Sequence, residues 1–154
     1  MLSKYPVQLC QFHQVKNVVT HLTKRPELEA SKELLTLVYM LCHTDKESFI
    51  GRFEEWVSWW DSFLKERSRD AATGKTRYTH SRLRSAYLGL KRNMKLLWTW
   101  YDNPMLRIPN TNNALESLFA DLKTKLRVHN GLSVRNRRIF IDNYFLRSFK
   151  NQPF

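Results

Sequence analysis

The sequence predicts a mainly α-helical protein with one short β-strand near residues 7–12. Apolar residues recur at spacings of three and four over most of the chain, which is the pattern of helices that bury one face. Alternation of apolar and polar residues is confined to a short stretch near the start. The chain has 154 residues with four glycines and five prolines, and 42% of its residues are hydrophobic, which is enough for one packed core.

The expected strand rests on the alternation of Val7, Leu9 and Gln11. No later segment alternates in the same way, so the strand has no evident partner within this sequence. A lone strand cannot satisfy its backbone groups, and it should therefore belong to a sheet that another segment supplies. This is a property expected of a fragment.

Periodicity predicts the helices in order along the chain. Thr44 or Asp45 is a suitable cap for the third helix, and Asn103-Pro104 should break the fourth. A polar loop rich in Lys and Arg separates the third and fourth helices. The expected helices cover residues 14–24, 27–42, 45–69 and 80–100, and the loop covers residues 68–79.

Two further helices are expected towards the end of the chain. The first runs over residues 114–127, after the cap-forming residues Thr111, Asn112 and Asn113, and it stops near Asn130-Gly131. The second starts after Ser133, a good N-cap, and continues to residue 150.

The net charge of +12 and the pI of about 10 indicate a polyanionic partner, most simply DNA. The excess is too one-sided for a surface of mixed ion pairs, so contact with phosphates is favoured. One group of basic residues flanks Gly74, and a second lies after residue 122. The candidate DNA-binding residues are Lys75, Arg77, Lys123, Lys125, Arg127, Arg135, Arg137 and Arg138.

Other sequence features argue against a membrane or secreted protein. No apolar run reaches the roughly 18–20 residues that span a bilayer, and the first residues lack the apolar core of a signal peptide. With two cysteines, a disulfide framework is not expected. We therefore expect a cytoplasmic protein, associated with the nucleoid if the source is prokaryotic, and no membrane partner.

Two motifs resemble a known family. Residues 109–116 read Pro-Asn-Thr-Asn-Asn-Ala-Leu-Glu, followed by Lys123 and by Leu-Arg-Val-His-Asn-Gly-Leu-Ser at 126–133. Residues 8–17 carry a Cys-x-x-His motif at Cys10 and His13. Together these stretches resemble the C-terminal part of the catalytic core in insertion-sequence DDE transposases of the Mutator-like (MULE) superfamily.

The resemblance implies an RNase H-like core interrupted by an all-helical insertion. Residues 1–25 would hold the last core strand and the following helix, residues 26–105 the insertion, and residues 106–154 the glutamate helix and a basic C-terminal helix. The chain would be a C-terminal fragment, because the two catalytic aspartates belong on strands that precede residue 7. DNA and the missing N-terminal half, or another transposase protomer, are the implied partners.

The resemblance also implies roles for single residues. Glu116 would be the third acid of the Asp-Asp-Glu triad and a metal ligand, and His13 would lie at or beside the active site. Cys10, His13, Asn112 and Asn113 belong to the motifs. The intact enzyme would use Mg²⁺ or Mn²⁺ to cleave and transfer DNA strands, whereas the chain alone should bind no metal and be inactive.

Several alternatives remain open. Asn113 and Glu116 have the spacing of a capping box. Cys10, His13, Cys42 and His43 could form a zinc site. Trp59 and Trp100 lie off the apolar stripes and could stack on unpaired bases. The whole chain could also be a non-enzymatic basic helical DNA-binding protein, or an inert remnant of a mobile element.

Overall fold

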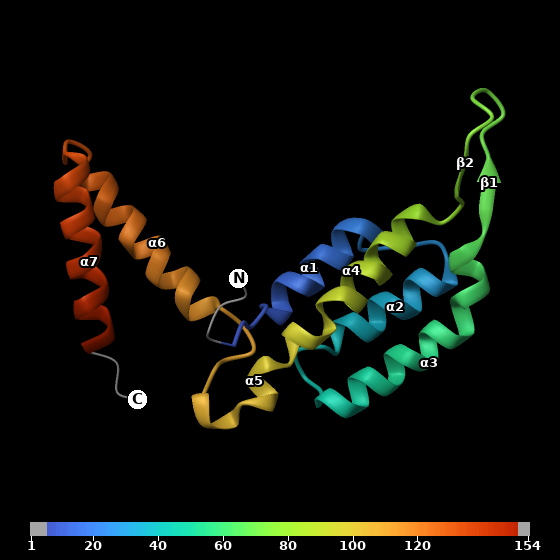
Figure 1. The fold of residues 1–154 in the computed structure, drawn as a ribbon, viewed down its shortest axis with the longest axis horizontal. Helices are drawn as coiled ribbons and strands as arrows, with labels where there is room; N and C mark the ends of the chain where they lie inside the picture. The colour runs from blue at the N-terminus through green and yellow to red at the C-terminus, as the bar shows by residue number, and fades with distance from the viewer. Residues whose placement is uncertain (1–5, 151–154) are drawn as a thin grey trace. The chain divides into compact units, whose positions relative to one another are not determined.

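The computed structural model describes residues 6–150, with the backbone alone at residues 149 and 150. Helices make up most of this part of the chain (Figure 1), and the prediction of a mainly α-helical protein is confirmed. The chain divides into two compact units at residues 111 and 112, whereas the sequence suggested boundaries after residues 25 and 105. The two units are described separately.

The first unit contains four longer helices, two short strands and two short helical turns. Their bounds are α1 (Gln11–Leu22), α2 (Glu29–Tyr39), α3 (Lys46–Lys65), β1 (Arg67–Arg69), β2 (Thr76–Tyr78), α4 (Ser81–Leu97), α5 (Thr99–Asp102) and the 3₁₀ turn η1 (Pro104–Leu106).

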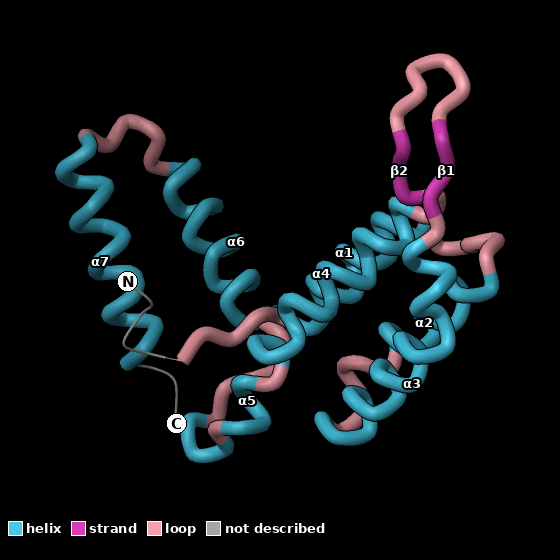
Figure 2. The backbone as a smooth tube through the Cα atoms, turned by 45° about the vertical axis from the view of Figure 1, so that its right-hand side comes forward, coloured by secondary structure: helices cyan, strands magenta, loops and turns pink. Residues whose placement is uncertain are grey.

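The core of this unit lies between its four longer helices. Helix α1 packs against α4 and α2, and α2 packs against α3, as Figure 2 also shows. Leu34, Leu90 and Trp98 are fully buried there. Trp56 is buried as well, and its Nε1 donates a hydrogen bond to the carbonyl of Ala30 at 3.1 Å, which joins α3 to α2.

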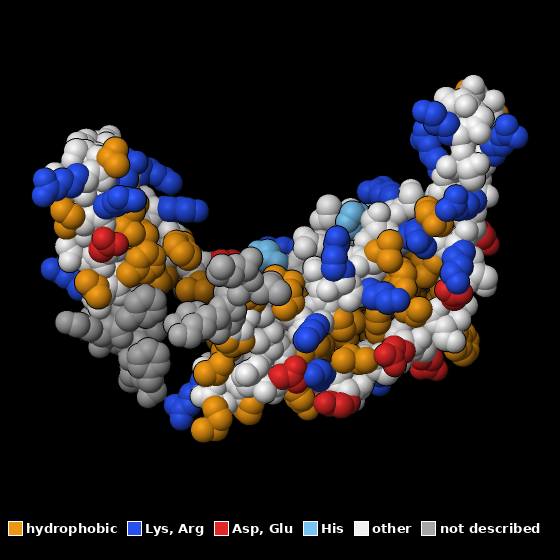
Figure 3. All heavy atoms as spheres, viewed as in Figure 1, with side chains coloured by type: hydrophobic (Ala, Val, Ile, Leu, Met, Phe, Trp, Pro, Cys, Tyr) orange, Lys and Arg blue, Asp and Glu red, His pale blue; other side chains and the backbone are white. Residues whose placement is uncertain are grey.

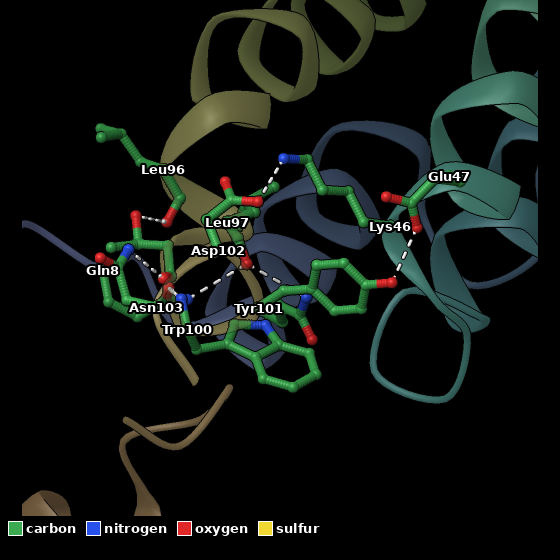
Figure 4. A network of polar contacts seen from close by, with 11 residues as sticks. Gln8, Lys46, Glu47, Leu96, Leu97, Trp100, Tyr101, Asp102 and Asn103 are labelled. Atoms are coloured by element: carbon green, nitrogen blue, oxygen red, sulfur yellow. Dashed lines mark hydrogen bonds and ion pairs between the residues drawn. The ribbon is translucent and has the colours of Figure 1, made fainter. Parts of the chain in front are cut away.

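The predicted strand near residues 7–12 is wrong, because residues 6–10 are irregular and α1 begins at Gln11. The last carbonyls of a helix have no partner within the helix, and this segment supplies donors to those of α4. Leu9 N donates to Leu96 O at 2.9 Å, and Gln8 Nε2 donates to Leu97 O at 3.2 Å. Gln8 Oε1 in turn accepts from Trp100 N at 2.9 Å (Figure 4). The segment thus satisfies its polar groups on a helix end instead of a sheet.

Helix α3 begins at the cap that its sequence suggests, and its first turn also contacts α5. The side chain of Asp45 accepts a hydrogen bond from Ser48 N at 2.8 Å, which confirms this residue as the cap and lowers its pKa. Figure 4 shows two contacts that join the start of α3 to α5, from Lys46 Nζ to Asp102 at 2.5 Å and from the Tyr101 hydroxyl to Glu47 at 2.9 Å.

The expected loop at residues 68–79 contains an antiparallel hairpin, in which Arg67 pairs with Tyr78, Ser68 with Arg77 and Arg69 with Thr76. Helix α3 ends at Lys65, before the expected residue 69, because Glu66 already has the extended backbone that leads into β1. Helix α4 ends at Leu97, and a separate turn, α5, follows it.

The second unit contains α6 (Asn113–Val128) and α7 (Val134–Lys150), close to the expected bounds. Ser133 Oγ accepts a hydrogen bond from Asn136 N at 3.3 Å, as expected for its cap. Phe119 meets Phe145 edge to face, with ring centroids 5.8 Å apart. The Tyr144 hydroxyl donates to Leu118 O at 3.0 Å, so polar and apolar contacts both hold α7 against α6.

Candidate functional site

Gln11 and Asn110, one from each motif stretch, meet in the first unit. Gln11 N donates to Asn110 O at 3.0 Å, and Asn110 Nδ2 donates to Gln11 Oε1 at 3.1 Å. The Gln11 side chain is fully buried, so these bonds satisfy groups that water does not reach. The fold therefore brings the Cys-x-x-His stretch against the stretch that leads into the Glu116 helix.

The same junction extends to two further segments. Gln11 Nε2 donates to Leu97 O at 3.1 Å, and Asn110 Nδ2 lies 3.4 Å from Cys42 O. Neither Gln11 nor Asn110 was among the site residues expected from the sequence. The sequence does offer one signal for them. Each is a polar amide residue inside a motif to which the resemblance assigns no catalytic role.

Cys10 and His13 lie at the start of α1. Cys10 is the residue just before the helix and is half-buried, and His13 is exposed in its first turn. Cys42 is half-buried with a free thiol; burial raises its pKa, and the neighbouring Cys10 raises it further. Over residues 6–150, no three side chains of His, Cys, Asp or Glu are grouped so that they could hold a metal ion.

Glu116 is exposed in the first turn of α6, as the sequence predicts. The N-cap residue is Asn112, and its side chain makes no capping hydrogen bond. Leu115 therefore occupies the third helical position, where a capping box needs its glutamate, so the box of Asn113 and Glu116 is not formed. The position of Glu116 near the positive end of the helix dipole suits a carboxylate.

The basic residues of α6 differ in how they are held. Lys123 lies two turns after Glu116 on the same face, about 10 Å along the axis, and it is exposed. Lys125 forms an ion pair with Asp121, and the Tyr144 hydroxyl, whose proton is shared with Leu118 O, lies 2.8 Å from the same carboxylate. These contacts lower the pKa of Asp121 and raise that of Lys125. Lys123 is thus better placed than Lys125 to meet a ligand.

Arg135, Arg137 and Arg138 are exposed near the start of α7. The first turn of this helix has no acidic residue. Cations at a helix N-terminus oppose the helix dipole. Their presence therefore costs helix stability, which is consistent with a role in binding an anionic partner.

The hairpin carries the other basic candidates. Lys75 and Arg77 are exposed on it, and Figure 3 shows Lys and Arg side chains around its tip. The side chain of Trp59 is 74% exposed, whereas Trp100 is partly buried against the core with its indole nitrogen covered. Of the two tryptophans proposed to stack on bases, only Trp59 presents its ring to solvent.

No protein-family model matches this chain, and no curated protein or solved structure matches it either. Among the helices of residues 6–150, none combines the length and the apolar character needed to cross a bilayer.

Proposed function

We propose that this chain is the C-terminal part of a DDE transposase of the Mutator-like superfamily, which binds DNA and supplies the third acid for strand cleavage and transfer. The observation that carries the proposal is the junction of Gln11 and Asn110. The two stretches that resemble the family lie about a hundred residues apart, yet they are the stretches that this fold fastens together. A resemblance by chance would give no reason for such a contact.

Glu116 is the acid that this chain contributes. A site for Mg²⁺ or Mn²⁺ needs further oxygen ligands besides Glu116. The two aspartates would come from the missing part of the core or from another protomer. The chain alone is therefore inactive in this proposal, and its own residues bind and position DNA.

Uncovered apolar side chains in the second unit also support the proposal. Leu115, Phe119, Ile139 and Leu146 are each 45–60% exposed. Apolar faces of this kind usually pack against another element. We assign the sheet of an RNase H-like core as the surface that covers them.

The test of DNA binding is fluorescence anisotropy of a labelled duplex of about 20 base pairs, measured over a range of salt. Affinity should fall steeply as salt rises, because phosphate contacts release counterions with a log–log slope of about −0.9 per contact. Absence of binding at low salt, or binding that salt does not change, would contradict the proposal.

Glu116→Gln separates the acid from the DNA-binding surface. In a complete core that provides two aspartates, this variant should lose strand cleavage and keep its DNA affinity. Glu55→Gln, at an exposed position of α3, is the control. A second candidate function is that of a non-enzymatic DNA-binding protein, which the exposed Lys and Arg side chains of the hairpin, α6 and α7 would suit equally well. In that case Glu116→Gln would leave every activity unchanged.

A further inference from the structure

The hairpin between α3 and α4 is a rigid, basic arm. Figures 1 and 2 show it extending beyond the ends of these two helices. Residues 65–78 contain five basic and two acidic side chains, and almost all of them are exposed. The arm is therefore a strongly charged surface that contributes little to the core.

The base of the hairpin is fixed by aromatic and ionic contacts. Arg67 and Arg84 lie over the ring of Tyr78, 4.5 and 4.0 Å from its centroid, and Arg67 also donates to the Tyr78 hydroxyl at 3.0 Å. His80 stacks on Phe63, with centroids 3.7 Å apart. These contacts connect the arm to both α3 and α4, so its direction is set by the helical unit.

The tip of the hairpin is an ordered turn. Asp70 Oδ1 accepts hydrogen bonds from the backbone amides of Ala72 at 3.0 Å and Thr73 at 2.9 Å. Gly74 N donates to Asp70 O at 2.8 Å, and Gly74 adopts a φ of +67°, which a glycine tolerates without strain. The arm therefore keeps its shape up to its end.

The basic side chains on the two faces of the arm differ in whether they have partners within the protein. Side chains that pair across the strands lie on the same face, so Arg77 lies opposite to the face of Arg67, Arg69 and Tyr78. Arg69 Nε donates to Gly74 O at 3.2 Å, and Arg67 is held by Tyr78. Among the described residues, the side chains of Lys75 and Arg77 have no hydrogen-bond or ion-pair partner, so both are available to a ligand.

The acids of the arm are already engaged. Asp70 closes the turn, and Glu66 accepts from His80 Nε2 at 3.0 Å. Both carboxylates are thus turned towards partners within the protein, and the arm keeps a net positive charge. A two-stranded ribbon has strands about 4.8 Å apart, and the major groove of B-form DNA, about 12 Å wide, admits such a ribbon.

We propose that the hairpin enters the major groove of double-stranded DNA and that Lys75 and Arg77 contact the DNA there. This inference rests on the proposed DNA binding and goes beyond it, because it names the element and the groove. An A-form RNA duplex has a deep, narrow major groove that does not admit the arm.

The first experiment compares Lys75→Ala/Arg77→Ala with Lys32→Ala/Arg52→Ala, which removes the same charge from an exposed surface that also contains Glu29 and Glu33. Anisotropy is measured with matched DNA and RNA duplexes. The hairpin variant should lose at least about tenfold more DNA affinity than the control, and its salt slope should fall by about two. RNA affinity should fall no more than in the control.

A second pair of variants separates the effect of the shape of the turn on DNA affinity from the effect of its charge. Asp70→Asn and Asp70→Ala both remove one negative charge, but asparagine keeps an acceptor for the turn. Charge alone predicts that both variants bind DNA more tightly than the wild type. An ordered arm predicts that Asp70→Ala binds several-fold more weakly than Asp70→Asn.

The possible failures can be told apart. If the wild type binds no duplex DNA at low salt, the proposed DNA binding fails, and this inference fails with it. If the wild type binds but the hairpin variant matches the control, DNA binding stands and the inference is overturned. An equal loss of RNA affinity, displacement by the minor-groove ligand netropsin, or equal affinities of the two Asp70 variants would also overturn it.

Discussion

Gln11 and Asn110 exchange two hydrogen bonds across 99 positions of sequence. The pair closes the first unit at the point where the chain leaves it towards α6. Gln11 also donates to the end of α4, so one buried amide connects the start of α1, the end of α4 and the segment before the Glu116 helix. Because these bonds are buried, the junction is expected to be rigid as well as stable.

Asn110→Ala tests this junction. The substitution leaves Gln11 Oε1 buried without its donor, so the free energy of unfolding should fall by about 1–3 kcal/mol. Asn17→Ala, the same change at an exposed position of α1, is the matched control and should change it by less than about 0.5 kcal/mol. Urea unfolding followed by tryptophan fluorescence measures both. Equal effects would show that the junction adds no stability.

Substitutions in α4 test the packing of the core of the first unit. Leu90 is fully buried, and Leu90→Ala should cost about 2–5 kcal/mol because it removes apolar contacts and leaves a cavity. Leu88, on the same helix, is 41% exposed, and Leu88→Ala should cost much less. The thermal unfolding midpoints of the two variants, each compared with that of the wild type, measure this difference. A small effect at Leu90 would contradict the packing described here.

Much of the fold could be predicted from sequence because helices carry local signals. The helix of Glu116 and the helix after Ser133 both follow residues of the cap-forming types and have a sustained apolar stripe, and both were placed to within one residue of their observed starts. The strand near residues 7–12 failed because three alternating residues also fit an irregular segment. What decides its structure is the free end of α4, almost ninety residues later, which no local pattern contains.

The hairpin was missed for a different reason. Its strands have three residues each, which is too short for alternation to show. Asp70 and Gly74 were the available signal, because an aspartate that accepts from following amides and a glycine with positive φ together make a tight turn. For the candidate site, sequence placed Glu116 and the exposed basic residues. It could not pair Gln11 with Asn110, because this contact depends on the packing of α1 against α4.

Cys42 should be less acidic than an ordinary cysteine. Burial, the larger cause, raises the pKa of its thiol, and Cys10 adds to the effect. In Cys10→Ser the burial remains, so the rate of alkylation by iodoacetamide should rise with pH at a higher midpoint than that of a free cysteine, since the thiolate is the reactive form. A midpoint at or below that of a free cysteine would contradict the buried environment.

The turn of the hairpin should respond to acid through Asp70. Hydrogen bonds from the amides of Thr73 and Ala72 lower the pKa of this carboxyl below its usual range. A lowered pKa in the folded state means that the contribution of the carboxylate to stability is complete above the ordinary aspartate pKa. It is lost as the pH falls through the lower folded value.

The amide shifts of Ala72 and Thr73, measured by NMR as a function of pH, report this titration. Their common midpoint should lie below that of an aspartate in an unfolded peptide, and Asp70→Asn should abolish the change because its amide does not titrate. If the two amides titrate at the ordinary value, the hydrogen bonds of Asp70 do not hold the turn in solution, and the arm would enter a groove as a flexible loop.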